Sequence, residues 1–223
     1  MIELKNVTKY FTTNNSKKYI LKEVTMVLPE VNIGILGRNG AGKSTLMRML
    51  GKIEFPNEGS IDSRNSFSWP LGLGGGFVGN MTGRANVKFV CTLYGKSREE
   101  TEAVIAYVKE FSELEEYFEM PIKTYSSGMK GRLGFGLSLA FDFDYMLIDE
   151  TLSVGDASFR SKAKERLRKK IETCNIILVS HDMKTLEEMC HSGLLVHEGK
   201  LTFYEDISEG IQRYNAINRE GKK

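Results

Sequence analysis

The sequence predicts an α/β protein with a parallel-rich core sheet, a small antiparallel β subdomain and an inserted helical subdomain. Three observations predict this fold. A short apolar run at residues 32–36 precedes a glycine-rich loop and a helix. Two further apolar runs, Tyr145–Ile148 and Ile176–Val179, are followed by polar residues and indicate buried strands. From about residue 84 the apolar residues recur at helical spacing instead.

The first 36 residues predict strands joined by turns. Ile2, Leu4 and Val7 are separated by polar residues, and a second segment with apolar runs extends from residue 19 to 28. The polar residues 12–16 between them indicate a turn. A strand at the N-terminus is not a signal peptide, so we expect none here.

The glycine-rich loop carries the main functional signal. Its residues fit the phosphate-binding pattern G-x-x-x-x-G-K-[ST] and read Gly37, Arg38, Asn39, Gly40, Ala41, Gly42, Lys43, Ser44 and Thr45. Glycines let several backbone N–H groups point inward at phosphate oxygens, and the following helix turns its positive end toward the anion. Lys43 adds a cation, and the Ser44 hydroxyl can ligate Mg²⁺. A glycine-rich loop could match by chance, but the order strand, loop, helix favours phosphate binding.

An inserted helical subdomain is predicted at about residues 84–141, within a single domain that spans residues 1–223. A helix begins near Ser97, and its apolar stripe contains Val104, Ile105, Val108 and Phe111. The acidic run at residues 113–116 fits a solvated face better than a site. Residues 71–79 hold five glycines and predict an irregular loop.

Further helices are predicted in the second half of the chain. The helix at residues 125–141 contains four glycines, which suggests close backbone packing. The helix at about residues 159–172 has a basic face that could contact an anionic lipid or polymer, although simple solvation is the favoured explanation. From Lys200 onward the chain predicts a strand, a turn and a helix.

Composition limits the possible functions. The net charge of +2 gives no electrostatic argument for binding nucleic acid. Three cysteines without C-x-x-C spacing indicate a reducing compartment, with neither a disulfide framework nor a zinc site. No stretch approaches the roughly 18 apolar residues that span a bilayer. If the protein acts at a membrane, we expect another chain to supply the spanning part.

Asp149 and Glu150 follow an apolar strand downstream of the phosphate loop. Asp149 can hold Mg²⁺ directly or through water. Glu150 can orient and polarise an attacking water molecule. Alone, the pair is weak evidence for a hydrolytic site. Its position downstream of the phosphate loop strengthens that interpretation.

The segment Tyr125–Met129 resembles the ATP-binding-cassette (ABC) family, whose diagnostic sequence is L-S-G-G-Q. Ser126 and Gly128 match that sequence, whereas Tyr125, Ser127 and Met129 depart from it. The resemblance implies that Ser126, Ser127 and Gly128 meet the γ-phosphate held by a second subunit. An N-cap serine alone would also explain Ser126, and the two roles are compatible.

Other positions are assigned by the same resemblance. His181, after the strand at residues 176–179, matches the family's γ-phosphate-sensing histidine. Asp156 belongs to a segment, residues 153–156, that resembles the loop crossing the dimer interface. The family stacks adenine on an aromatic residue two after a lysine, which is Phe11 here. Tyr10 and Tyr19 are less favoured candidates, and core packing would explain any of the three.

Several segments resemble a narrower branch, the ATPase subunits of capsular-polysaccharide exporters. They are residues 68–72, 75–77, 82–84 and 121–129. This resemblance implies an ATPase that uses ATP and Mg²⁺ as a head-to-tail homodimer. It also implies a transmembrane permease subunit, a location at the cytoplasmic face of the inner membrane, no nucleic acid and no required contact with the polymer.

Alternatives remain open at this point. The chain could serve an O-antigen or teichoic-acid exporter, a non-transport ABC ATPase in translation or DNA repair, or, least favoured, a P-loop metabolic kinase. Two residues depart from the branch. Val78 stands where close relatives carry the glutamine that links to the membrane partner, and Ala85 stands where a glutamate is usual.

Overall fold

The computed structural model describes residues 1–13, 16–70, 76–149 and 155–220. The described residues form two compact units. The first contains residues 1–70, 143–149 and 174–220, and the second contains residues 76–142 and 155–173. The second unit therefore includes segments on both sides of the helical subdomain that we expected at about residues 84–141.

Two sheets build the first unit. The strands β1 (Ile2–Thr13), β2 (Ser16–Leu28) and β4 (Glu58–Ser63) form an antiparallel sheet in the order β2-β1-β4. The larger sheet has the order β5-β6-β3-β7-β8. Its strands are β3 (Ile33–Leu36), β5 (Tyr145–Asp149), β6 (Asn175–Val179), β7 (Ser192–His197) and β8 (Lys200–Tyr204). Every pairing in it is parallel except β7 with β8.

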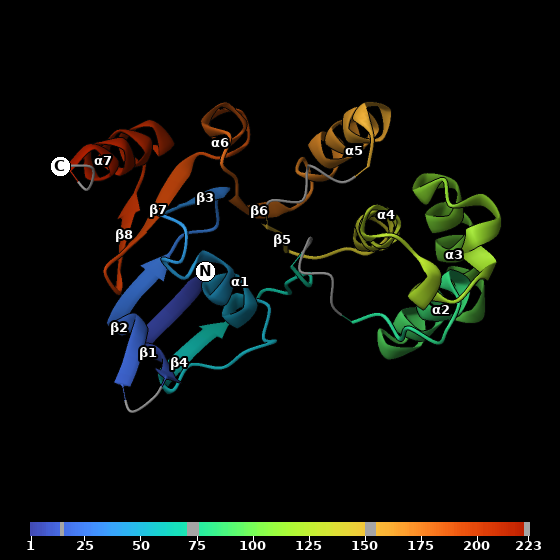
Figure 1. Ribbon diagram of the computed structural model, residues 1–223, viewed down its shortest axis with the longest axis horizontal. Coiled ribbons are helices and arrows are strands. Elements are labelled where there is room, and N and C mark those ends of the chain that lie inside the picture. Colours follow the sequence, from blue (N-terminus) through green and yellow to red (C-terminus); the bar gives the residue numbers. More distant parts are fainter. Residues whose placement is uncertain (14–15, 71–75, 150–154, 221–223) are drawn as a thin grey trace. The chain divides into compact units, whose positions relative to one another are not determined.

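The two faces of the larger sheet are covered differently. Ile33 and Ile35 of β3 belong to the main hydrophobic cluster, which includes α1 (Lys43–Leu50) and residues of β1 and β2. Gly34, between them, faces Leu186 of α6 (Met183–Met189) and Ile207 of α7 (Ile207–Glu220). The sheet therefore lies between α1 and the small sheet on one side and α6 and α7 on the other (Figure 1).

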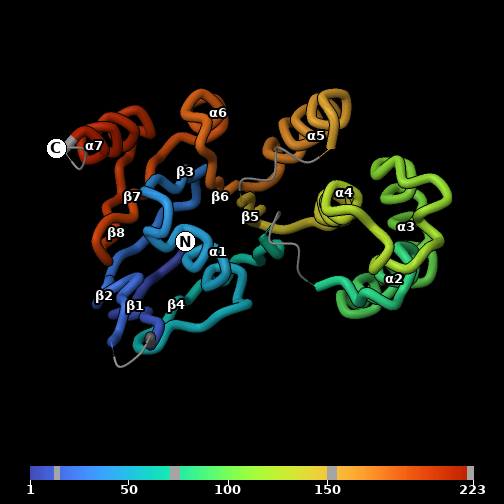
Figure 2. Tube along the Cα trace, viewed as in Figure 1, coloured from blue at the N-terminus to red at the C-terminus, as the bar shows by residue number. Residues whose placement is uncertain are grey.

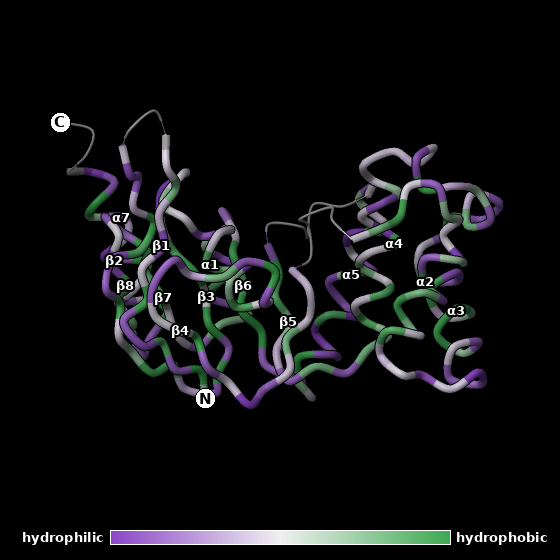
Figure 3. The backbone as a smooth tube through the Cα atoms, turned by 90° about the horizontal axis from the view of Figure 1, so that it is seen from below, coloured by the Kyte–Doolittle hydropathy of each residue, from purple (hydrophilic) through white to green (hydrophobic). Residues whose placement is uncertain are grey.

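Burial explains why the central strands read as continuous apolar runs. All residues of β3 and β5 are buried, and β6 is buried except at its first residue. A parallel sheet covered on both faces selects apolar residues at successive positions rather than at alternate ones. β3 and β6 accordingly appear mostly green in Figure 3.

Helices build the second unit. They are α2 (Gly83–Leu93), α3 (Arg98–Ser112), α4 (Ser127–Leu139) and α5 (Ala157–Lys170), with 3₁₀ turns η1 (Glu115–Glu119) and η2 (Ile122–Thr124). The helices α2, α3 and α4 pack side by side (Figure 2). Phe111 of α3 packs against α4 and α5, with its ring centroid 6.0 Å from that of Phe135 and 5.4 Å from that of Phe159.

A buried asparagine shapes the start of this unit. The Asn86 side chain accepts a hydrogen bond from the Val78 N–H at 2.7 Å. Its amide donates to the carbonyl oxygens of Val78, Met81 and Thr82 at 2.9–3.3 Å. Asn86 therefore holds residues 78–82 in place before α2. The first five residues of the loop expected at 71–79 lie outside the described part of the chain.

Candidate nucleotide-binding site

The phosphate-binding loop joins β3 to α1 in the first unit. Gly42 has a φ of 105°, and a Cβ atom there would lie 2.2 Å from the Ile20 Cγ2 atom. A Cβ atom at Gly37 would lie 2.7 Å from the Val196 carbonyl oxygen. Real Cβ contacts are never this short, so these two positions require glycine. The loop therefore runs close against β2 and β7.

The N-terminus of α1 has no side-chain cap. Its N-cap residue is Gly42, and no acidic residue stands in its first turn. The N–H groups in the first turn of a helix have no intrahelical partners, and the helix dipole makes this end positive. The end of α1 that meets the loop thus has the properties of an anion site.

Lys43 lies folded against the loop that precedes it. Its Nζ atom donates to the carbonyl oxygen of Gly37 at 2.7 Å and to that of Arg38 at 3.2 Å. Only 9% of the residue is exposed. Burial lowers the pKa of the ammonium group, and the nearby Asp149 carboxylate opposes this shift. Lys43 thus places a cation beside the loop backbone.

The remaining loop residues differ in exposure. Arg38, Asn39 and Gly40 are exposed, whereas Ala41, Gly42 and Ser44 are half-buried. Thr45 is buried, and its Oγ1 atom accepts a hydrogen bond from Arg48 at 3.2 Å. The Thr45 hydroxyl is therefore engaged within α1.

Asp149 and His181 lie at the edge of the sheet where the parallel strands end. Asp149, the last residue of β5, pairs with Val179 of β6, and Val179 pairs with Ile35 of β3. The phosphate loop follows β3 at the same edge. Asp149 is 8% exposed, and His181 is exposed two residues beyond β6. Lys43, Ser44, Asp149 and His181 therefore belong to one edge, and Glu150 lies outside the described residues.

The oxygen ligands at this edge suit Mg²⁺. The Ser44 hydroxyl and the Asp149 carboxylate are hard donors, which this ion prefers. Within the described ranges no group of three or more His, Cys, Asp or Glu residues could hold a metal. Mg²⁺ is commonly bound through one or two protein ligands together with substrate phosphates, and the donor set fits that mode.

The aromatic candidates for adenine stacking differ in how their rings are covered. Phe11 is 41% exposed, and the Lys9 Nζ atom lies 5.4 Å from its ring centroid. The Tyr10 ring lies 5.6 Å from that of Tyr19 and has the Lys17 Nζ atom 4.0 Å from its centroid. Phe11 therefore offers more accessible ring surface than Tyr10.

An ion-pair network that the sequence did not predict includes Lys9, whose ammonium group lies near the Phe11 ring. The Lys9 Nζ atom lies 2.8 Å from the Glu54 Oε1 atom, and Arg48 Nε lies 2.9 Å from Glu54 Oε2. The network joins β1 to α1. Its members are up to 45 residues apart and match no motif, so sequence reasoning had no signal for it.

The residues resembling the ABC signature begin α4 in the second unit. The Ser126 Oγ atom accepts a hydrogen bond from the Met129 N–H at 3.2 Å, so Ser126 is the N-cap. Ser127 is exposed. A Cβ atom at Gly128 would meet nothing closer than the Ser126 Oγ atom at 3.8 Å. The packing of this unit does not require glycine at position 128.

Asp156 begins α5 in the same unit. Its Oδ1 atom accepts a hydrogen bond from the Phe159 N–H at 2.9 Å, and its Oδ2 atom lies 2.8 Å from Arg132 Nη2. Arg132 also lies 3.3 Å from Glu113 and 4.5 Å from the Phe159 ring centroid. Asp156 is therefore an N-cap tied to α4, a role that the sequence did not indicate. The predicted residues thus fall into two groups, one in each unit.

Comparisons with known sequences give matches along nearly the whole chain. A family model described as "ABC transporter" matches residues 21–153. The chain is 48% identical to the polysialic acid transport ATP-binding protein KpsT of Escherichia coli, over 96% of this chain and 98% of that protein. It is 40% identical to the capsule polysaccharide export ATP-binding protein CtrD of Neisseria meningitidis, over 97% and 100%. The teichoic acids export ATP-binding protein TagH of Bacillus anthracis is 34% identical, over 88% of this chain and 36% of that protein.

Solved structures share the fold. The chain resembles a dimeric structure of the ATP-binding cassette MJ0796 bound to ADP and Pi, with a TM-score of 0.78 and 21% identity. The similarity covers 93% of this chain and 99% of that one. The predicted fold class, with its mixed sheet, antiparallel β subdomain and helices, is confirmed.

Proposed function

The chain belongs to the ABC transporter family, and from this premise we propose that it is the ATP-hydrolysing subunit of a capsular-polysaccharide exporter. The observation that carries this proposal is the near full-length similarity to polysialic acid and capsule polysaccharide ATP-binding proteins, at 40–48% identity. The teichoic-acid alternative receives less support, because that relative is 34% identical and the chain spans about a third of its length.

ATP binding would draw on the residues around the phosphate loop. The uncapped N-terminus of α1 supports a contact between its N–H groups and the β- and γ-phosphates. Lys43 would exchange its contacts with the loop carbonyls for phosphate oxygens, which bind an ammonium group more strongly because they are charged. The exposed ring of Phe11 would stack on adenine.

Hydrolysis would use the residues at the ends of β5 and β6. Ser44 and Asp149 would hold Mg²⁺, which when bound offsets the charge of the phosphate oxygens. Glu150 would accept a proton from the attacking water, and His181 would contact the γ-phosphate. The burial of Asp149 at the strand end supports its part in this assignment.

A second copy of the chain would complete each nucleotide site. Ser126, Ser127 and Gly128 begin a helix in the other compact unit, and the proposal assigns them to the partner's γ-phosphate. Asp156 would lie near the interface between the two copies. The dimeric form of the cassette MJ0796 supports this arrangement by analogy.

The exporter would also contain a permease. None of the helices within the described ranges is long and apolar enough to cross a membrane. Membership of a transporter family supports a separate transmembrane permease subunit, with this chain bound to it at the cytoplasmic face of the inner membrane. The polymer need not touch the ATPase.

Gene deletion in the host organism tests the proposal. We expect the deletion strain to retain polymer inside the cell and to display none on its surface. The wild-type gene should restore surface polymer, whereas a Lys43→Ala gene should not, because ATP hydrolysis by that variant falls on the order of 100-fold or more. Normal surface capsule in the clean deletion strain would refute the function, and wild-type turnover by folded Lys43→Ala protein would refute the role of Lys43.

A further inference from the structure

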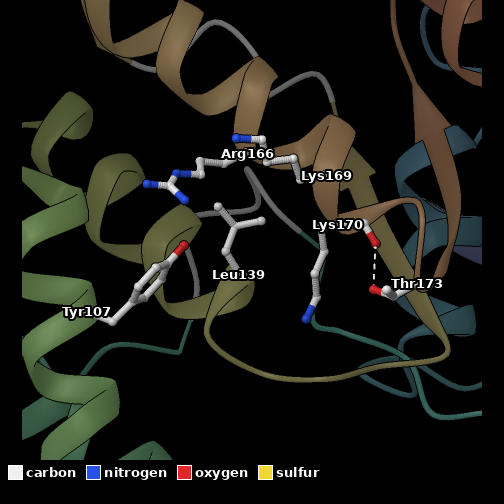
Figure 4. A pocket seen from close by; sticks show the side chains of 6 residues that line it. All are labelled: Tyr107, Leu139, Arg166, Lys169, Lys170 and Thr173. Carbon is white, nitrogen blue, oxygen red and sulfur yellow. Dashed lines mark hydrogen bonds between the residues drawn. The ribbon is translucent and has the colours of Figure 1, made fainter.

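A pocket of about 200 Å³ lies within the second unit, apart from the residues assigned to ATP. Its walls come from α3, α4, α5 and the residues just after α5 (Figure 4). The lining residues are Tyr107, Leu139, Arg166, Lys169, Lys170 and Thr173. Three of the six are cationic and none is acidic.

Arg166 is the key cation of this pocket. The structure pairs it with no carboxylate in the ranges it describes, whereas Lys169 lies 2.9 Å from Glu165 and Lys170 lies 2.6 Å from Asp142. The guanidinium group of Arg166 extends toward the hydroxyl end of Tyr107, with Leu139 beside them (Figure 4). Arginine presents a planar fork of N–H donors that matches the oxygens of a phosphate group.

Tyr107 adds a neutral donor. Burial raises the pKa of its phenol, so the hydroxyl stays protonated at neutral pH. Thr173 contributes less, because its hydroxyl already donates to the Lys170 carbonyl oxygen at 3.0 Å. The groups available to a ligand are therefore the Arg166 guanidinium and the Tyr107 phenol, with the exposed Lys169 ammonium group beside its Glu165 partner. All of the charged ones are hydrogen-bond donors without acceptor capacity.

The charge of α5 favours an anion here. The helix carries seven basic residues and one acidic residue, a net charge of +6, whereas the whole chain carries +2 and the rest of it therefore −4. Basic residues in a last helical turn also offset the helix dipole, which accounts for Lys169 and Lys170. That explanation does not extend to Arg166, which lies before the last turn and faces Tyr107.

We propose that this pocket binds a phosphate ester through Arg166, Tyr107 and Lys169. Leu139 forms the apolar wall against which the ester's carbon atoms rest. Two sources share this chemistry: a soluble phosphorylated compound and the headgroup of an anionic lipid. The two have the same contacts in the pocket and differ in whether a bilayer must be present.

Glycerol 1-phosphate and lipid vesicles serve as the probes. The whole chain is labelled with ¹³C-tyrosine, and the Tyr107 ring signal is assigned from the Tyr107→Phe variant. ADP is kept saturating so that the phosphate loop is occupied. Co-sedimentation with vesicles of phosphatidylglycerol and phosphatidylcholine is compared with sedimentation on phosphatidylcholine alone.

We expect a saturable shift of the Tyr107 signal, with affinity about tenfold weaker in Arg166→Gln because one charge-assisted contact is lost. Arg98→Gln is the matched control, since it removes the same charge from an exposed position that does not line the pocket. Lys169→Gln gives a second test if Arg166→Gln fails to fold, and it should weaken binding less.

Binding to glycerol 1-phosphate identifies a soluble ester as a sufficient ligand. Sedimentation on phosphatidylglycerol vesicles alone, lost in Arg166→Gln, identifies the lipid headgroup. The proposal is overturned if the wild-type protein binds neither probe. It is equally overturned if the Arg166→Gln and Arg98→Gln variants lose the same affinity, because the effect would then be one of net charge.

Discussion

Phe11 and Tyr10 are neighbours in β1, yet their rings have different surroundings. Tyr10 is in contact with Tyr19 and Lys17, whereas Phe11 is 41% exposed and has Lys9 beside its ring. A stack between an aromatic ring and a base is worth about 1–3 kcal/mol in nucleic-acid systems. We expect Phe11→Ala to weaken ATP binding roughly tenfold and Tyr10→Ala to weaken it less. Titration with a fluorescent nucleotide gives the order, and the reverse order would move the role to Tyr10.

Gly40 and Gly42 have similar backbone conformations but different surroundings. Both have positive φ, 78° and 105°, which costs a residue with a side chain roughly 1–2 kcal/mol. A Cβ atom at Gly40 would have no neighbour within 4 Å, whereas one at Gly42 would clash with Ile20. We expect Gly42→Ala to lower the free energy of unfolding more than Gly40→Ala. Urea denaturation measures both, and equal losses would mean that strain alone explains the glycines.

Glu100 makes the stability gained from helix capping depend on pH. It closes a capping box with Ser97 at the start of α3, and its hydrogen bonds to Ser97, together with Lys96, lower its pKa to about 2. Because this pKa lies below the unfolded-state value of about 4.5, the ionised carboxylate stabilises the fold at pH values above about 4.5. This contribution is lost as the pH falls through about 2.

The Glu100→Gln variant tests this coupling. We expect it to be less stable than wild type at pH 7, with a difference that shrinks between pH 4.5 and 2. Urea midpoints across that range measure the effect. Glu99→Gln is the control, because it changes the same charge in the same turn outside the capping box. A difference that stays constant with pH would contradict the coupling.

Elements were predictable where their signal is local. β3, β5 and β6 are apolar because they are buried, and the loop pattern predicted that a helix, α1, follows the loop. α6, with seven residues, is too short for its periodicity to stand out. The strand order β5-β6-β3-β7-β8 depends on pairing between distant segments, so it could not be read from local patterns. The contacts that support the site also join segments distant in the sequence, so local patterns did not predict them. Examples are Glu54 with Lys9 and Arg132 with Asp156.

Two glycines of α4 have different surroundings, so their substitutions distinguish a packing role from a functional role. A Cβ atom at Gly136 would lie 2.9 Å from the Phe111 ring, which is held among other rings. Gly136→Ala should therefore lower the free energy of unfolding by about 1–3 kcal/mol. Gly128→Ala should leave it unchanged or raise it by up to ~1 kcal/mol, because alanine favours helices.

For Gly128→Ala we expect a loss of ATP hydrolysis without a loss of stability. If the partner's phosphate approaches this helix end, an added methyl group obstructs it and turnover falls, although the protein is no less stable. Thermal or urea unfolding and an ATPase assay on the same preparations measure both properties. Normal turnover by Gly128→Ala would show that the glycine is not needed at an interface.

At the scale of the whole molecule, the two groups of site residues require two chains in the proposed mechanism. Lys43 and Asp149 belong to one compact unit, and Ser126 begins a helix of the other. ATP would then join the copies, its phosphates neutralised by Lys43 and Mg²⁺ from one chain and by a helix N-terminus from the other. In this arrangement, loss of the γ-phosphate would remove contacts that only the dimer makes, so hydrolysis should shift the equilibrium toward monomers.

Glu150→Gln should trap the dimer. The amide keeps the shape of the side chain but cannot accept the proton of the attacking water. We expect this variant to bind ATP, hydrolyse it very slowly and accumulate as a dimer with ATP but not with ADP. Size exclusion with light scattering measures the mass. The proposed permease is missing from this assay and would add contacts between the copies, so a partial shift counts as support.

Adding Ser126→Arg to Glu150→Gln should restore the monomer, because it places bulk and charge at the end of α4. The substitution also removes the N-cap contact with Met129, worth about 1 kcal/mol. Ser126→Ala is therefore the matched control: it loses the cap without adding bulk and should leave most of the dimer intact. If Glu150→Gln binds ATP, turns it over at the wild-type rate and stays monomeric, both the role of Glu150 and the two-chain site are wrong. If Ser126→Ala dissociates the dimer as fully as Ser126→Arg does, the serine hydroxyl itself, rather than free space at the helix end, holds the two chains together.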